Sequence, residues 1–214
     1  YYVALLAYCI RRPETVTVGF FNNRRLRDWM FTRLIAIETS RHISRIFCKM
    51  LLPFGIAPRW RPLLECPLRV GEAARSRVET VLAALAVPAG VKRVVVNVNA
   101  SDLCPNRRWP RDSFEALLRR MIAPVEGKPA VAAFLIGGSE DAGYVSALAA
   151  RFPGEAVYNL AGKIGIEELA ALMQCCDLYA GNDSGPLHLA VAAGLPTVSI
   201  FGPETPGLYG PLGE

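Results

Sequence analysis

The pattern of apolar and polar positions along the chain changes near residue 90. Before it, a β-rich run at 15–20 predicts a strand, and apolar residues at helical spacing predict helices over 40–52 and 73–87. Ser40 is the expected N-cap of the first helix, and Pro53 with Gly55 should end it. After residue 90, short apolar runs alternate with helical patterns. The expected strands are 93–98, 131–136, 156–160, 178–181 and 197–201, and the expected helices are 112–122, one ending at 150, 166–175 and 186–193.

This alternation predicts the α/β class. Strands that are apolar throughout, separated by helices, are typical of a parallel sheet covered on both faces. We therefore expect a Rossmann-like, doubly wound domain over residues 91–214 that binds its ligand beyond the carboxyl ends of the strands. Residues 1–90 are expected to form part of a second domain, followed by a connector at 58–67 that holds three prolines.

Composition and charge narrow the classes of protein that fit this pattern. Of the 214 residues, 52% are hydrophobic and 20% charged, which excludes intrinsic disorder. The net charge of +5 is divided unevenly: residues 1–90 carry 14 Lys and Arg against 6 Asp and Glu, giving +8, and residues 91–214 carry 10 against 13, giving −3. The basic segment could bind an anionic membrane surface, an anionic substrate or nucleic acid. The alternative is that its arginines simply lie on solvent-exposed faces of helices.

A nucleic-acid partner and a zinc site are both disfavoured by what the sequence lacks. No recognised nucleic-acid-binding motif accompanies the basic segment, so no nucleic-acid partner is expected. Six cysteines without a C-x-x-C pair and only two histidines give poor support for a zinc site, so no metal is expected.

The segment 181–188, Gly-Asn-Asp-Ser-Gly-Pro-Leu-His, lies between an expected strand and the helix after it. Asp183 or Ser184 is placed to cap that helix, and Pro186 suits its first turn. Free amides at a helix N-terminus bind anions, and His188 lies about one turn further on. The sequence therefore predicts an anion site here, and the alternative is a well-capped helix with a partly buried histidine.

Two further loops follow expected strands at the same edge of the sheet. In Asn97-Val98-Asn99-Ala100-Ser101, Ser101 can donate a hydrogen bond, and Arg107 or Arg108 can bind a phosphate through two parallel hydrogen bonds. Glu140, in the Gly-Gly-Ser-Glu-Asp segment 137–141, stands where a Rossmann acid would meet a ribose hydroxyl, or is simply an acid in a first helical turn. The segment is too short for a G-x-G-x-x-G fingerprint, which argues against a nicotinamide-dependent oxidoreductase.

In this order, the segments resemble glycosyltransferase family 9, the ADP-heptose:lipopolysaccharide heptosyltransferases and their relatives. The resemblance covers about residues 94–211 and is looser before residue 90. It rests on Asn-x-Asn-Ala-Ser, Arg-Arg-Trp-Pro at 107–110, the segments 137–141 and 181–188, Asn-Leu-Ala-Gly-Lys at 159–163 with Glu-Glu-Leu at 167–169, and Phe-Gly-Pro-Glu-Thr at 201–205.

The resemblance implies a GT-B architecture, in which two Rossmann-like domains face a cleft. The carboxyl-terminal domain would bind the nucleotide-sugar, and the partial amino-terminal one would hold the acceptor. The donor-binding residues carried over are Ser101, Ser184 and Gly185 at the diphosphate, His188 beside it, Asp183 at the sugar or its phosphate oxygens, Glu140 at the nucleoside, and Arg107 in place of a family lysine. Arginine keeps the charge of that lysine with a different geometry.

The implied activity is inverting transfer of a sugar, heptose in the best-known case, from a nucleoside diphosphate to a lipopolysaccharide-type acceptor. The co-substrate would be ADP-heptose, with no separate cofactor, and the acceptor a lipid-linked saccharide. The resemblance places such an enzyme in the cytoplasm, in peripheral contact with the anionic inner face of the plasma membrane. A catalytically silent nucleotide-binding or assembly module on the same fold is the alternative.

The family's catalytic base is an aspartate near the start of the amino-terminal domain, after its first strand. This sequence shows no such strand and loop, so the catalytic residue is unassigned. The chain is expected to begin part-way through that domain, to stop before the last helices of the second, and to transfer no sugar by itself.

Overall fold

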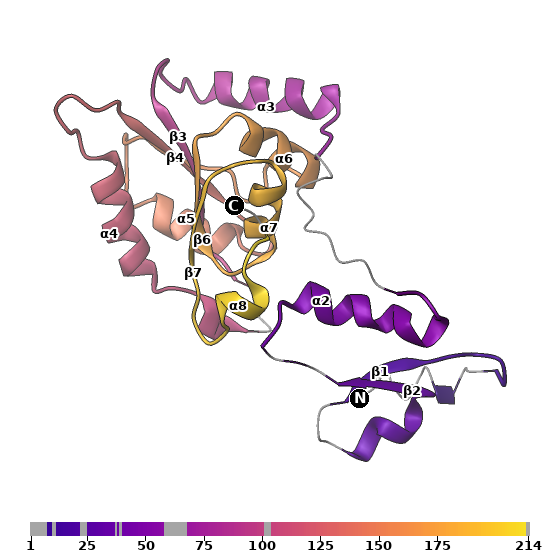
Figure 1. Ribbon diagram of the computed structural model, residues 1–214. Coiled ribbons are helices and arrows are strands. Elements are labelled where there is room, and N and C mark those ends of the chain that lie inside the picture. Colours follow the sequence, from indigo (N-terminus) through magenta and orange to yellow (C-terminus); the bar gives the residue numbers. More distant parts are fainter. Residues whose placement is uncertain are drawn as a thin grey trace. The chain divides into compact units, whose positions relative to one another are not determined.

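The computed structural model describes residues 8–9, 12–21, 25–36, 38, 40–57, 68–100 and 104–212 of the chain (Figure 1). The chain divides into two compact units. The N-terminal unit contains residues 1–61 and 206–210, and the larger sheet unit contains residues 62–205 and 211–214. No helix in the described part of the chain is both long and apolar enough to cross a membrane.

The sheet unit is built on five strands that all run parallel. They are β3 (Lys92–Asn97), β4 (Val131–Ile136), β5 (Val157–Asn159), β6 (Leu178–Asn182) and β7 (Thr197–Ile200), in the spatial order β5-β4-β3-β6-β7. Strand β3, the first of this unit, lies in the middle of the sheet, and the later strands are added on both sides of it. This confirms the doubly wound α/β fold, and the direction of winding reverses between β3 and β6.

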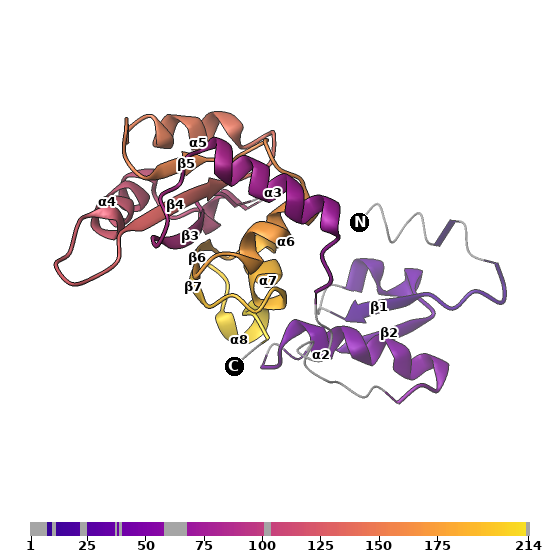
Figure 2. The same cartoon turned by 90° about the horizontal axis from the view of Figure 1, so that it is seen from above.

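Helices cover both faces of this sheet (Figures 1 and 2). On one face lie α3 (Glu72–Ala84), α6 (Ile166–Gln174) and α7 (Gly185–Ala192), and on the other lie α4 (Arg111–Ile122) and α5 (Ala142–Ala149). Each expected strand and helix of this unit is present, with its ends within three residues of the predicted ones.

Alternating side chains of the strands supply the two cores. Val95 and Phe134 point to the face of α3, α6 and α7, while Val96 and Leu135 point to the face of α4 and α5. All four side chains are fully buried. Because successive residues of a strand point to opposite faces, a strand covered on both sides must be apolar at every position.

Helix α3 belongs to the sheet unit, although it precedes residue 90. Val78 and Leu82 of α3 pack in the same core as Leu169 and Leu172 of α6. The sheet unit therefore starts at Pro62, about 30 residues before the change of pattern in the sequence. The proline-rich stretch 58–67 itself lies outside the described residues.

The N-terminal unit contains a parallel pair of strands, β1 (Val18–Phe21) and β2 (Arg33–Ala36), and two 3₁₀ helices, η1 (Arg25–Met30) and η2 (Lys49–Phe54). Its α-helix α2 (Ile43–Cys48) runs directly into η2, and α8 (Pro206–Tyr209) returns to it near the other end of the chain. The sequence did not predict β2, because four residues with mostly exposed side chains carry no apolar alternation.

The N-cap of α2 differs from the prediction. His42 occupies this position instead of Ser40, and its Nδ1 accepts a hydrogen bond from the Ser44 amide at 3.2 Å. Since Nδ1 accepts, Nε2 carries the proton and donates to the Gly210 carbonyl at 2.8 Å. Gly55 ends η2 as expected, in the left-handed conformation that glycine adopts without strain (φ 72°). Pro53, which was expected to end the helix together with Gly55, lies inside η2 instead.

Candidate ligand-binding site at the carboxyl ends of the strands

A cavity of about 620 Å³ opens at the carboxyl ends of the central strands of the sheet unit. Its walls come from the segments that follow β3, β4 and β6, and from the start of α6. The lining residues are Asn97, Asn99, Ala100, Arg107, Arg108, Ile136, Gly137, Gly138, Glu140, Asp141, Ile164, Gly165, Ile166, Leu169, Asp183, Ser184, Gly185 and Pro186. The cavity thus lies at the switch point between β3 and β6, where doubly wound sheets bind ligands.

The N-terminus of α7 faces this cavity and is not capped by a side chain. Ser184 is the N-cap residue, as expected, but its hydroxyl makes no capping hydrogen bond. Instead Ser184 Oγ accepts a hydrogen bond from Asn97 Nδ2 at 2.6 Å and donates to the Asn182 carbonyl at 3.2 Å. The prediction that the Ser184 or Asp183 side chain caps α7 is wrong, because neighbouring groups from β3 and β6 engage the hydroxyl first.

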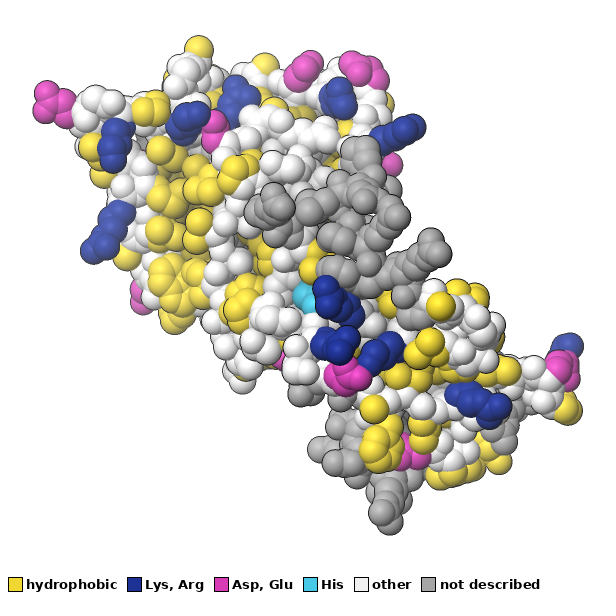
Figure 3. Space-filling model, in the orientation of Figure 1, with side chains coloured by type: hydrophobic (Ala, Val, Ile, Leu, Met, Phe, Trp, Pro, Cys, Tyr) yellow, Lys and Arg dark blue, Asp and Glu magenta, His cyan; other side chains and the backbone are white. Residues whose placement is uncertain are grey.

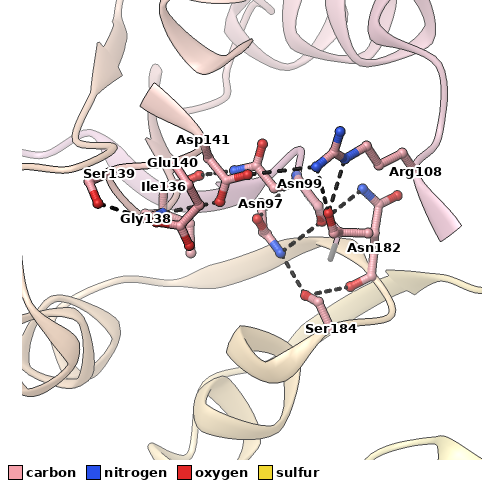
Figure 4. A network of polar contacts seen from close by, with 11 residues as sticks. Asn97, Asn99, Arg108, Ile136, Gly138, Ser139, Glu140, Asp141, Asn182 and Ser184 are labelled. Atoms are coloured by element: carbon pink, nitrogen blue, oxygen red, sulfur yellow. Dashed lines mark hydrogen bonds and ion pairs between the residues drawn. The ribbon is translucent and has the colours of Figure 1, made fainter. Parts of the chain in front are cut away.

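Three buried asparagines link the ends of the strands (Figure 4). Asn97 Oδ1 accepts from the Asn99 amide at 3.2 Å, and Asn99 Nδ2 donates to the Ile136 carbonyl of β4 at 2.8 Å. Asn182 of β6 donates through Nδ2 to the Asn99 carbonyl at 3.2 Å and accepts from the Trp109 amide at 3.0 Å. These bonds hold the loop after β3 against β4 and β6.

The two arginines of the Arg-Arg-Trp-Pro segment have different surroundings. Arg108 donates through Nε and Nη2 to the Ala100 carbonyl, at 3.0 and 2.7 Å, and Nη2 lies 3.8 Å from Asp141 Oδ1. Its guanidinium therefore ties the loop after β3 to the loop after β4.

Arg107 lies between two carboxylates of the sheet unit. Its Nη1 is 3.7 Å from Asp183 Oδ2, and its Nη2 is 3.4 Å from Glu204 Oε1. Partial burial opposes its charge, but Asp183, Cys104 and Glu204 together raise the pKa of Arg107 above the usual arginine value. The guanidinium therefore remains a fixed positive charge at the cavity wall.

Two hydrogen-bond acceptors in the cavity wall are buried without a hydrogen-bond partner: Asp183 Oδ2 and Asn99 Oδ1. Their residues are only 3% and 4% exposed. Buried polar atoms in proteins are nearly always satisfied by protein or by ordered molecules. Acceptors of this kind suit a ligand that carries hydroxyl or amino donors.

The opposite part of the cavity is apolar. Ile164, Ile166 and Leu169 line it from the segment after β5, whereas Asp183 to Pro186 line it from the segment after β6. Strands β4 and β3 separate β5 from β6 in the sheet, so these two segments line opposite ends of the cavity. The end after β5 is apolar and the end after β6 is charged. Glu140 lies between them in the loop after β4, where Gly138 leaves room for its carboxylate.

The structure brings together most of the predicted donor-binding residues. Arg107, Glu140, Asp183, Ser184 and Gly185 all line the cavity. His188 is exposed on α7 and is not among the lining residues, and Ser101 lies outside the described residues. Among the described residues, no group of three or more His, Cys, Asp or Glu side chains could hold a metal ion.

Sequence reasoning did not find the apolar wall or the function of the asparagines. Ile166 and Leu169 look like ordinary helix positions in the sequence, and Ile164 falls in the segment before that helix. The asparagines do carry a signal, because Asn97 and Asn182 end strands that are otherwise apolar. A buried amide at the end of such a strand needs partners, and only neighbouring strands can supply them.

A doubly wound parallel sheet with a cavity at its switch point places the sheet unit in the Rossmann-like class of α/β domains, the class from which GT-B enzymes are built. The chain belongs to glycosyltransferase family 9 (heptosyltransferase), whose profile matches residues 1–214.

Relatives within the family agree in sequence and in fold. Lipopolysaccharide heptosyltransferase 2 of Salmonella typhimurium is 32% identical over 115 residues, which are 52% of this chain and 32% of that protein. Lipopolysaccharide heptosyltransferase 3 of Escherichia coli is 27% identical over 94% of this chain and 55% of its own length. The glycosyl transferase family 9 structure from Veillonella parvula has a TM-score of 0.69 at 23% identity, covering 97% of this chain and 56% of that one. The matches thus span about a third to just over half of each relative.

Proposed function

We propose that this chain provides the donor-binding part of an inverting glycosyltransferase of lipopolysaccharide synthesis, with ADP-heptose as the donor. The cavity at the switch point carries this proposal, because it combines an apolar wall for a nucleobase with an arginine and a helix N-terminus for a diphosphate. A solved relative in Escherichia coli is described as an ADP-heptose lps heptosyltransferase II, with a TM-score of 0.66.

The proposed pose follows the polarity of the cavity wall. The nucleoside lies between Ile164 and Ile166, with Glu140 accepting from a ribose hydroxyl. The diphosphate meets Arg107, the Ser184 hydroxyl and the Gly185 amide at the start of α7. The unsatisfied Asp183 Oδ2 accepts from a sugar hydroxyl. His188 and Ser101 are the further predicted neighbours of the diphosphate.

In the proposed reaction, an acceptor hydroxyl loses its proton to a base and attacks the anomeric carbon of the sugar. The bond from that carbon to the diphosphate breaks, and the configuration inverts. Arg107 and the amide dipoles at the α7 N-terminus stabilise the charge that develops on the departing diphosphate. The base and the lipid-linked saccharide acceptor belong to the amino-terminal side in this proposal, and no cofactor takes part.

Isothermal titration calorimetry with ADP tests the donor site. We expect the folded 214-residue chain to bind ADP, and Arg107→Ala to weaken binding at least about tenfold, since hydrogen bonds to charged groups contribute roughly 1.5–3 kcal/mol. His188→Ala tests the predicted neighbour on α7 in the same assay.

The matched control for this experiment is Arg120→Ala, which removes the same charge from an exposed position on α4. We expect it to leave ADP affinity unchanged. A folded wild-type sample that binds no ADP contradicts the proposal. A chain that binds ADP but tolerates Arg107→Ala favours the alternative of a catalytically silent module.

A further inference from the structure

The hydroxyl of Ser184 adopts an unusual arrangement for a serine that begins a helix. An N-cap serine normally accepts a hydrogen bond from the second or third backbone amide of its helix. In α7 the second position is Pro186, which has no N–H, and the third is Leu187, whose amide lies 3.1 Å from the Ser184 carbonyl oxygen. The Ser184 side chain accepts from neither, which leaves the first amide, that of Gly185, at the cavity wall.

Asn97 accounts for this arrangement. Its Oδ1 already accepts from the Asn99 amide, so the hydrogen-bonding pattern directs Nδ2 toward Ser184 Oγ, 2.6 Å away. Asn97 is 2% exposed at the end of β3, so its amide group has little freedom to turn. Figure 4 shows this contact between β3 and the start of α7.

The bond from Asn97 also determines where the proton of Ser184 can point. Because Oγ accepts from Asn97, the O–H must be directed elsewhere, and it reaches the Asn182 carbonyl at 3.2 Å. This bond is at the long end of the range for O–H···O contacts. A stronger acceptor in the cavity, such as a phosphate oxygen, can therefore take the hydroxyl proton without breaking the bond to Asn97.

Tyr179 closes the buried side of this arrangement. Burial raises the pKa of Tyr179 to about 12, although the nearby side chains of Ser184 and Asn97 oppose the shift. The phenol therefore stays uncharged at neutral pH and adds no negative charge beneath a site for an anion. On the cavity side, the buried and unsatisfied Asp183 Oδ2 independently indicates that a ligand belongs at this end.

We propose that Asn97 is a positioning residue that holds the Ser184 hydroxyl away from the α7 amides, so that this hydroxyl and the Gly185 amide both face a bound diphosphate. The inference rests on the proposed function, because the diphosphate is that of the nucleotide donor. Asn97 also bonds to the Asn99 backbone and so holds the loop after β3. In this inference its effect on the diphosphate passes through Ser184, and this distinguishes it from a residue that merely stabilises the end of β3.

A double-mutant cycle measured with ADP by calorimetry tests this dependence. We expect Asn97→Ala to weaken ADP binding up to about tenfold, the effect of one hydrogen bond of roughly 0.5–1.5 kcal/mol. In a Ser184→Ala background the same substitution should change the affinity less than about twofold, since the group that it positions is gone. An equal loss in both backgrounds overturns the inference.

The pair Asn159 and Ser146 provides a matched control. Asn159 Nδ2 donates to Ser146 Oγ at 2.9 Å, but neither residue lines the cavity. Asn159→Ala should leave ADP affinity unchanged in both the wild-type and the Ser146→Ala backgrounds. Asn97→Leu is measured beside Asn97→Ala, because it preserves side-chain volume if the smaller residue destabilises the sheet unit.

Crystal structures of the nucleotide-free wild type and Asn97→Leu provide a measurement that needs no ligand. We expect the Ser184 side chain to adopt another rotamer in the variant and to approach the Leu187 amide. An unchanged Ser184 rotamer overturns the inference even if ADP binds. If the wild type binds no ADP, the proposed function fails, whereas the control of Ser184 by Asn97 is still decided by these structures.

Discussion

Gly181 shows how closely the strands approach at the floor of the cavity. A Cβ at this position would lie 2.7 Å from the Asn97 carbonyl oxygen and 2.9 Å from the Tyr179 hydroxyl. Contacts this short do not occur with real side chains, and the Asn97 backbone cannot yield because it is hydrogen-bonded within the sheet. A glycine is therefore required where β6 passes β3 beside Ser184.

We expect Gly181→Ala to lower the free energy of unfolding by about 1–3 kcal/mol, the usual cost of overpacking a tight interior. Urea denaturation followed by circular dichroism measures it. Gly143→Ala, at an open position, is the control. Unchanged stability of Gly181→Ala would mean that β3 and β6 lie farther apart than in this structure.

At the scale of elements, periodicity located the strands and helices of the sheet unit, with their ends a few residues out at most, but it did not find the groups that cap the helices. The continuous apolar run 131–136 defines β4 to the residue, because both faces of the strand are covered. The caps differ from the prediction: His42 replaces Ser40 before α2, and Ser184 caps nothing. A capping side chain has several partners within reach, and contacts distant in sequence decide among them.

Helix α5 contains a glycine at a position where its backbone and surroundings would also accept alanine. Gly143 is exposed in its first turn, and a Cβ there would meet no atom within 4 Å. We expect Gly143→Ala to raise the free energy of unfolding by about 0.5–1 kcal/mol, since alanine restricts the unfolded chain more than glycine does. The urea midpoint should rise, and a fall would show that Gly143 has a contact absent from this structure.

At the scale of the whole molecule, the two units differ in charge and in surface. The N-terminal unit carries 11 Lys and Arg against 3 Asp and Glu, giving +8, and the sheet unit carries 13 against 16, giving −3. Figure 3 shows hydrophobic and basic side chains interspersed on the surface of the N-terminal unit. Phe47, Leu52 and Phe54 of α2 and η2 are each more than half exposed. Apolar and basic side chains together suit the surface of an anionic bilayer.

We therefore expect the chain to cosediment with vesicles that contain phosphatidylglycerol and much less with vesicles of phosphatidylcholine alone. Binding should decrease as salt is raised from 50 to 500 mM, conditions chosen because salt screens exposed charges (the Debye length is about 10 Å at 0.1 M). Equal binding to both kinds of vesicle would contradict the expected membrane contact.

The sequence by itself determined the fold of the sheet unit and the loops that form the site. Strand and helix periods are local properties of the chain, and the ends of parallel strands necessarily meet at one edge of the sheet. The sequence alone therefore predicts that Arg107, Glu140, Asp183, Ser184 and Gly185 lie near one another.

Only the tertiary structure decided which hydrogen bonds these residues make. In the structure Arg108 donates to the Ala100 carbonyl, the Ser184 hydroxyl accepts from Asn97, and Asp183 Oδ2 has no hydrogen-bond partner. Helix α3 also belongs to the sheet unit. Each of these outcomes depends on groups that are distant in sequence and a few ångströms apart in space, a distance that no local pattern encodes.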